Sequence, residues 1–330
     1  MTGRCSSNTV HTHNPGGSKV RQRLGFLRAS AARKFRFQPS AFGGPSRFRK
    51  AAAAISLAAF FVTAAQPAAG SSVPAGIQQP VAAQQDDRPA LWVVSDADTV
   101  IYLFGTFHAL DDRTNWFSKS VRAAFDASDE LVLETLVPED PAELHAILAR
   151  NAITGKARVG EQVVPASKAP SFVASAGQAM SAGRSVGMSV EHGADAVLRR
   201  AANEAGKPVG GLESFEYQLR MFGSLPPAAA KPGARPAAGD LSRLLTHMQA
   251  SWKRGDNDAF SAILDTVEAQ SPATYKTLFV DRNANWAGWI ADRLQQPGTV
   301  FVAVGTGHLI GRDSVQRKLA ARGIATFRVS

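Results

Sequence analysis

The chain has 330 residues, 45% of them hydrophobic, which is enough to bury the core of a globular protein. Its formal net charge of +10 would suit nucleic-acid binding, but 11 of the 37 Lys and Arg residues lie in residues 1–50, and no Asp or Glu precedes Asp86. The other 26 basic residues are balanced by 27 acidic ones, which argues against a nucleic-acid partner.

Residues 1–69 have the layout of a secretory leader. A basic flank ends at Lys50, an apolar run follows at 51–65, and small residues come after it. We expect cleavage near residue 69, a flexible Ala-, Gln- and Pro-rich linker at 70–88, and a periplasmic or secreted protein. Retention of the apolar run as a membrane anchor is the alternative, although the run is short for a bilayer span.

The single cysteine, Cys5, also lies in this leader. The mature chain would therefore contain no disulfide, no thiolate metal ligand and no cysteine nucleophile. Its chemistry must come from His, carboxylate, hydroxyl and Arg side chains.

The folded domain is expected at residues 89–330. Apolar runs at 91–94 and 100–104 flank a polar turn and predict a hairpin. Helical spacing and apolar runs then predict alternating elements in this order: helix 118–127, strand 131–134, helix 141–150, helix 194–205, strand 208–213, helices 241–253, 258–268 and 273–294, strand 300–304, helix 314–322 and strand 324–329. This alternation predicts an α/β fold with a mainly parallel central sheet flanked by helices.

A short motif occurs twice, each time after an apolar strand. Residues 99–110 and 299–310 share Thr, Val, Gly, Thr and His at equal spacing, which gives Gly105-Thr106-Phe107-His108 and Gly305-Thr306-Gly307-His308. A glycine lets the backbone turn sharply at a strand end, and the carboxyl edge of such a sheet is where α/β folds bind ligands. We expect the two segments to be related by approximate twofold symmetry, with His108 and His308 facing one crevice.

Two glutamates end other predicted strands and should reach the same edge of the sheet. Glu134 follows 131–133, and Glu213 follows 208–212, where a helix-capping role is the alternative. Imidazole and carboxylate groups in one crevice are ligands expected for Zn, Mn or Co, although they could also act without metal as a general base and its orienter. Arg282, on the apolar face of a predicted helix, could clamp a substrate or pair with a glutamate.

These residues resemble the TraB/GumN family, which is similar to the Tiki proteases and more distantly to the erythromycin-esterase and ChaN-like proteins. The resemblance covers residues 89–330 and is strongest at 90–108, 131–134, 211–213, at Asp281-Arg282-Asn283 with Trp286, and at 305–308. It implies a metal-dependent peptidase without the usual metalloprotease motif. The segments at 155–190 and 226–239 depart from the family pattern, so the substrate stays open.

The sequence therefore predicts an exported hydrolase, with a peptide or small-molecule substrate, in which His108, His308 and Glu134 hold a divalent metal. Metal-bound water would be the nucleophile, Glu213 a base or fourth ligand, and Arg282 an electrostatic clamp. Two alternatives stay open: a protein that binds a peptide or a metal in the same crevice without turnover, and a metal-free esterase.

Overall fold

The computed structural model describes residues 88–117, 119–151, 156–159, 162–165, 171–225 and 238–330. The predicted leader, almost all of the predicted linker and most of the predicted loop at 226–239 lie outside these residues. The described residues fall within one compact unit. In this part of the chain, no helix combines the length and the hydrophobicity that crossing a bilayer requires.

Strands and helices alternate along most of the chain. The strands are β1 Leu91–Ser95, β2 Thr99–Thr106, β3 Glu130–Leu136, β4 Lys156–Val159, β5 Gln162–Pro165, β6 Val209–Ser214, β7 Gly298–Gly305 and β8 Phe327–Arg328. The helices are α2 Lys119–Ala127, α3 Pro141–Arg150, α4 Ser171–Ser185, α5 Ala194–Glu204, α6 Phe215–Ser224, α7 Ala238–Lys253, α8 Asp258–Gln270, α9 Pro272–Tyr275, α10 Asp281–Arg293 and α11 Val315–Ala320, with a π-helical turn η2 Lys276–Val280 and a 3-10 turn η3 Thr306–Leu309.

Six strands form a mixed sheet in the order β6-β3-β7-β2-β1-β8, and β4 pairs separately with β5. The strands β6, β3, β7 and β2 are mutually parallel, while β1 is antiparallel to both β2 and β8. The predicted α/β class is thus confirmed, but the sheet is not purely parallel. The antiparallel part comes from the hairpin β1–β2 and from the short last strand.

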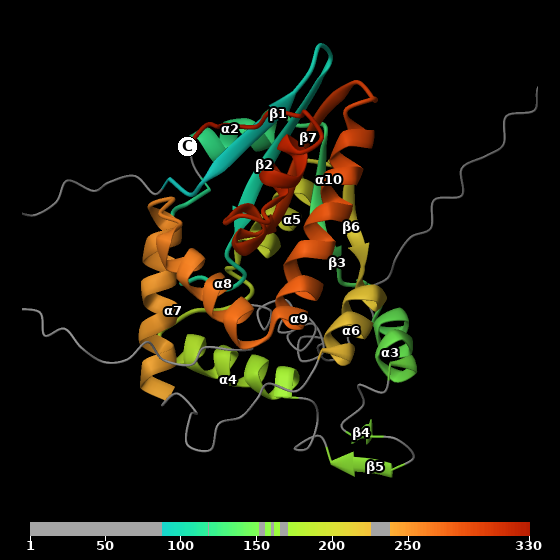
Figure 1. The fold of residues 1–330 in the computed structure, drawn as a ribbon, viewed down its shortest axis with the longest axis vertical. Coiled ribbons are helices and arrows are strands. Elements are labelled where there is room, and N and C mark those ends of the chain that lie inside the picture. Colours follow the sequence, from blue (N-terminus) through green and yellow to red (C-terminus); the bar gives the residue numbers. More distant parts are fainter. Residues whose placement is uncertain (1–87, 118, 152–155, 160–161, 166–170, 226–237) are drawn as a thin grey trace, which may run out of the picture. The chain divides into compact units, whose positions relative to one another are not determined.

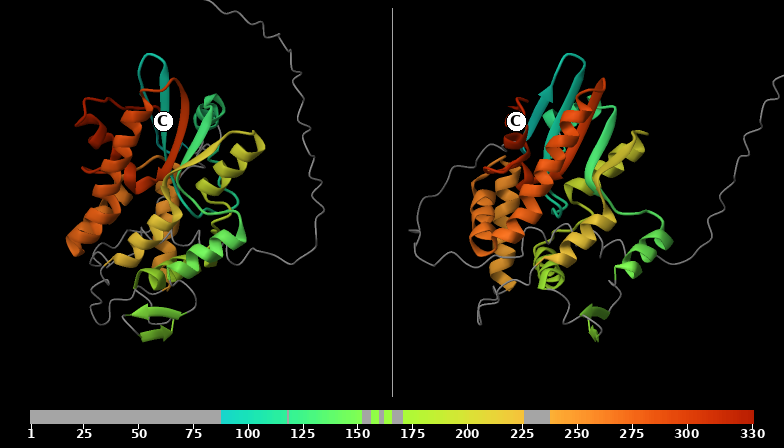
Figure 2. Two further views of the ribbon diagram at one scale, coloured as in Figure 1. Left: turned by 90° about the vertical axis from the view of Figure 1, so that its right-hand side faces the viewer. Right: turned by 45° about the vertical axis from the view of Figure 1, so that its right-hand side comes forward.

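Helices cover both faces of this sheet (Figure 1). On one face, Ile101 and Val302 pack against α10 and α11 through Trp286, Ile290 and Leu319. On the other face, Phe104 and Phe301 pack against residues of α2, α5, α7 and α8. Figure 2 shows α10 and α5 on opposite sides of the strands. Because both faces are covered, the inner strands read as continuous apolar runs rather than as alternating ones.

Two local predictions differ from the structure. Strand β3 does not end at Glu134 but continues to Leu136, so Glu134 is still part of the strand. The long helix expected at 273–294 is divided into α9, the π-helical turn Lys276–Val280 and α10. A π-helical turn adds a residue to the helix and rotates the residues after it, and apolar periodicity alone does not reveal it.

Candidate functional site

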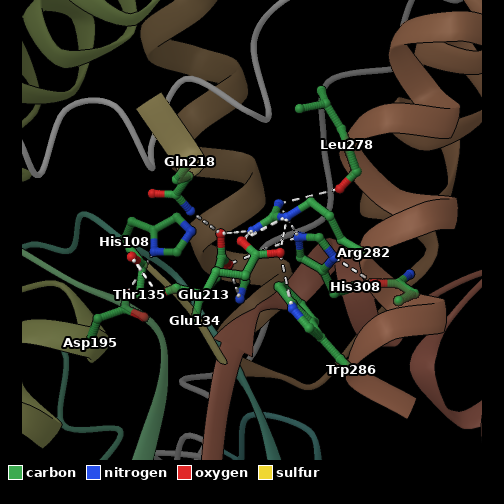
Figure 3. A network of polar contacts seen from close by, with 12 residues as sticks. His108, Glu134, Thr135, Asp195, Glu213, Gln218, Leu278, Arg282, Trp286 and His308 are labelled. Atoms are coloured by element: carbon green, nitrogen blue, oxygen red, sulfur yellow. Dashed lines mark hydrogen bonds and ion pairs between the residues drawn. The ribbon is translucent and has the colours of Figure 1, made fainter. Parts of the chain in front are cut away.

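Four neighbouring parallel strands bring the predicted site residues to one edge of the sheet. Strands β3 and β6 carry Glu134 and Glu213 near their carboxyl ends, and β2 and β7 lead into His108 and His308. These strands are adjacent in the sheet, with Thr106 in register with Gly305. Arg282, in the first turn of α10, joins them from one face of the sheet (Figure 3).

Arg282 is the centre of the network. Its side chain is fully buried, and its Nε donates to Oε1 of Glu213 at 2.8 Å. Its Nη2 donates to Oε1 of Glu134 at 2.5 Å and to Oε2 of Glu213 at 2.7 Å. Its Nη1 contacts Nε2 of His308 at 3.2 Å and the carbonyl oxygen of Leu278 at 3.3 Å. All five N–H groups of a guanidinium are thereby matched to acceptors, which favours the internal ion-pairing role over a direct clamp on substrate.

His308 is held as a neutral imidazole. Its Nδ1 lies 2.6 Å from Oδ1 of Asn283, while Nδ2 of Asn283 donates to the backbone oxygen of Asp313 at 2.8 Å. This fixes the amide, so Nδ1–H of His308 donates and Nε2 keeps its lone pair toward Arg282. The ring packs 4.4 Å from the ring of Trp286. Burial first, and then the charge of Arg282, lower the pKa of His308 to about 3.

His108 has a different environment. Its Nδ1–H donates to Oδ2 of Asp195 at 2.7 Å, and Asp195 lies in the first turn of α5. Burial alone would lower the pKa of His108, but the charge and hydrogen bond of Asp195, with help from Glu134, raise it above its ordinary value. The backbone of the same turn is close-packed, since a Cβ on Gly193 would lie 2.0 Å from the backbone oxygen of His108. Glycine is required there.

Both imidazoles approach Glu134. A Cβ on Gly305 would lie 3.1 Å from Nε2 of His108 and 3.4 Å from Oε2 of Glu134, so these two atoms converge over a residue without a side chain. On the other side, Nε2 of His308 lies 3.9 Å from the same Oε2. The backbone N–H of Gly305 donates to that oxygen at 3.2 Å. The two histidines, distant in sequence, therefore flank one carboxylate.

The two glutamates differ in charge stabilisation. For Glu134, burial acts to raise the pKa, but Arg282 and the two histidines outweigh it and lower the pKa to about 2. For Glu213, burial and the charge of Glu134 raise the pKa despite the hydrogen bonds from Arg282. Trp286 Nε1 also donates to Oε1 of Glu213 at 3.1 Å. Both oxygens of Glu213 are engaged in holding Arg282 and Trp286.

The donor set partly fits a divalent metal. Ligands about 2.0–2.2 Å from one metal lie roughly 3–4 Å apart, and the separation of 3.9 Å between His308 and Glu134 is compatible with this range. Both Nδ1–H groups are hydrogen-bonded to oxygen acceptors, as is usual for metal-binding histidines. Within the described residues, however, no three His, Cys, Asp or Glu side chains are already arranged to hold a metal ion. The guanidinium of Arg282 shares Glu134 and His308 instead.

Four residues of this network have no role in the sequence prediction: Asp195, Gln218, Asn283 and Trp286. Asn283 and Trp286 belong to the segment that resembles the family, but their spacing does not reveal what they contact. Asp195 is an acidic residue in the first turn of α5, and Gln218 is a buried amide on α6. Only their placement beside His108 and Glu134 distinguishes them from capping and core residues.

Comparison with known proteins agrees with the resemblance seen in the sequence. The model of the TraB/PrgY/gumN family matches residues 90–167 and 152–327, well over half of the chain. The chain is 31% identical over 136 residues to the "Uncharacterized protein YbaP" of Escherichia coli (strain K12), a match that covers 41% of this chain and 50% of the relative. The protein of that name from Shigella flexneri matches to the same extent, so the chain spans about half the length of these curated relatives. No solved structure matches. The chain belongs to the TraB/PrgY/gumN family.

Proposed function

We propose that this chain is a metal-dependent hydrolase, acting as a peptidase, and that its site is the cluster around Glu134. One observation carries the proposal. His108 and His308, from two separate strands, present Nε2 toward opposite sides of the Glu134 carboxylate, and each Nδ1–H is held by an oxygen acceptor. A structural histidine seldom needs such a paired arrangement, whereas a shared ligand does.

The charge of the cluster supports a bound cation. Two buried carboxylates, those of Glu134 and Glu213, pair with a single guanidinium, that of Arg282, and a third, partly exposed carboxylate, that of Asp195, pairs with His108. With both imidazoles neutral, these side chains carry two more negative than positive charges. Buried charge of this kind is costly unless it is compensated, and a divalent ion held by His108, Glu134 and His308 would compensate it.

When bound, such a metal would supply Lewis acidity and lower the pKa of a bound water. The residues of the chain do the rest. Arg282 keeps Glu134 ionised and in position, and Glu213 with Trp286 fixes the guanidinium. Asp195 and Asn283 orient the two rings. His108 is the site histidine nearest to solvent, with its side chain 9% exposed and that of Asp195 27% exposed, so substrate approaches from this side.

The pair His108–Asp195 favours a second candidate, metal-free hydrolysis. A carboxylate that holds Nδ1–H leaves the Nε2 lone pair of His108 available as a general base. In that reaction Nε2 takes a proton from water, the water oxygen bonds to the acyl carbon, the bond to the leaving group breaks, and the leaving group takes the proton from His108.

The test is hydrolysis of a peptide library and of matched esters by the purified protein, with chelator and after addition of Mn, Co or Zn. The variants are His108→Gln and His308→Gln, and the control is His145→Gln on the exposed side of α3. Loss of activity on chelation, with recovery in one metal, supports the metal-dependent reaction. Activity that survives chelation but not His108→Gln supports the metal-free one, and saturable binding without product supports a binding protein. Unchanged activity in both variants rejects the site.

Export of the domain through residues 1–69 is part of the same proposal. The leader pattern in the sequence supports it. Amino-terminal sequencing of protein expressed with the full chain tests it, and we expect the mature chain to begin near residue 70. An intact amino terminus in a membrane fraction would support the retained anchor instead.

A further inference from the structure

Gln218, on α6, has an unused polar atom beside the candidate site. The residue is fully buried, and its Nε2 donates to Oε1 of Glu134 at 2.7 Å. Its Oε1 is one of three buried side-chain polar atoms in the described part of the chain that have no hydrogen-bond partner. A buried acceptor without a donor lowers the stability of the folded protein by about 1–3 kcal/mol, so a partner for this oxygen is expected.

The orientation of this amide is fixed by Glu134. The carboxylate also accepts hydrogen bonds from Nη2 of Arg282 and from the backbone N–H of Gly305, so it acts as an acceptor throughout. A rotated amide would place Oε1 of Gln218 against a carboxylate oxygen. The amide nitrogen must therefore face Glu134, and the amide oxygen must point elsewhere. Figure 3 shows this oxygen turned away from Arg282, on the side of Glu134 where His108 lies.

The partner of this oxygen must be a hydrogen-bond donor small enough for an enclosed position. Water meets both conditions, because enclosed polar positions in proteins commonly hold it. We propose that Gln218 is a water-positioning residue, whose Oε1 accepts a hydrogen bond from the water consumed in hydrolysis and holds it beside Glu134 and His108. This inference rests on the proposed function, and it applies with or without a metal.

Such a contact orients the nucleophile. With one O–H directed at Gln218, the lone pairs of the water are turned toward the acyl carbon. The water oxygen then forms the new bond to that carbon, the bond to the leaving group breaks, and one water proton ends on the leaving group. Alignment of a nucleophile in this way contributes mainly to kcat rather than to KM.

The first experiment does not depend on activity. A crystal structure of the wild-type protein, at a resolution that reveals ordered water, should show a water about 2.5–3.0 Å from Oε1 of Gln218. The same water should lie within reach of Glu134 or His108. An Oε1 that contacts only protein atoms, or nothing, would overturn the proposal.

The second experiment compares Gln218→Met with Gln249→Met. Gln249 is also a buried glutamine whose Nε2 donates to a carboxylate, that of Asp111, but it lies on α7 outside the network. We expect Gln218→Met to lower kcat by about 10- to 100-fold with little change in KM. The control should retain wild-type kcat, and thermal unfolding of both variants reports whether they fold.

Added hydroxylamine then separates positioning of water from support of Glu134. Acid and hydroxamate are measured as products of an ester and an amide with the same acyl group. If Gln218 positions water, Gln218→Met shifts the product ratio toward hydroxamate with both substrates. An unchanged product ratio would mean that Gln218 only supports Glu134. A loss of activity confined to the amide substrate would mean that Gln218 binds the substrate N–H. Either result overturns the inference. A wild type that makes neither product rejects the proposed function, and the crystallographic water alone then decides whether Gln218 binds water.

Discussion

The segments around His108 and His308 share a sequence motif, but the two histidines lie in different environments. His108 is paired with the carboxylate of Asp195, and its pKa is raised. His308 is paired with the amide of Asn283, lies against Trp286 and Arg282, and its pKa is lowered to about 3. The motif thus places two imidazoles at one edge of the sheet, while residues from other elements decide the charge of each.

The two sides of the candidate site therefore differ in structure. The His308 side is a closed, fully paired region, in which one guanidinium links two carboxylates and a neutral ring. The His108 side is more open, and its ring can accept a proton. Under the proposed function, the His308 side would be a rigid charged region, and the ring that can change its protonation would lie on the side from which substrate approaches.

Removing the cation on the His308 side should have the largest effect. Arg282→Met leaves Glu134 and Glu213 buried without their counter-charge, and we expect a loss of about 3–5 kcal/mol in the free energy of unfolding. Urea denaturation at pH 7 measures it. The control is Arg122→Met, which breaks an exposed pair with Asp126 in α2 and should cost less than about 1 kcal/mol. If the two variants lose similar stability, the guanidinium is not the support of the closed region.

The sequence predicts the strand ends better than their surroundings. His108, His308, Glu134 and Glu213 follow from apolar runs and a repeated motif, since parallel strands must present their carboxyl ends at one edge. All hydrogen-bond donors of Arg282 have partners within the protein, and helical spacing does not predict this. The spacing places the residue on the apolar face of the helix but does not identify its partners.

The hydrogen-bond partners of the two histidines could not be predicted from the sequence, for a physical reason. Asp195 comes from a helix 87 residues away from His108, and Asn283 comes after a π-helical turn that shifts the register of the predicted long helix. Such contacts depend on how elements dock, and a single sequence carries no signal for docking geometry. The fold class and the antiparallel hairpin β1–β2 were predictable because patterning is local, whereas the antiparallel pairing of the short strand β8 with β1 was not.

Acid should distinguish the two histidines by the sign of their contribution to stability. The pKa of His308 is about 3 in the folded protein and about 6.5 when unfolded, so between these values only the unfolded chain binds the proton. Stability contributed by a neutral His308 is therefore lost as pH falls, by about 2 kcal/mol between pH 7 and pH 5. Urea denaturation of metal-free protein at both pH values measures it.

His108 should behave in the opposite way. Its raised pKa contributes stability that is present below the unfolded pKa and is lost as pH rises through the folded one. His308→Gln should therefore reduce the loss of stability between pH 7 and pH 5, and His108→Gln should increase it. Equal changes in the two variants would show that the two rings share one environment, which would contradict the comparison.

The finest test exchanges the partners of the two rings. Asp195→Asn replaces a carboxylate acceptor by an amide, and Asn283→Asp does the reverse, so the double variant keeps the net charge of the chain. We expect the pKa of His108 to fall in Asp195→Asn and the pKa of His308 to rise in Asn283→Asp, because a carboxylate at hydrogen-bond distance favours the imidazolium. Titration of the ring proton signals by NMR in metal-free protein measures both. Asp195→Asn should cost only about 1 kcal/mol in the free energy of unfolding, since a hydrogen bond to His108 remains and only its charge assistance changes. Asn283→Asp should cost more, about 3–5 kcal/mol, because it buries a carboxylate and replaces the N–H that donates to the backbone oxygen of Asp313. If the pKa of His108 does not move in Asp195→Asn, then Glu134 rather than Asp195 sets the charge of that ring. The difference between the two histidines would then lie in their exposure to solvent and not in their hydrogen-bond partners.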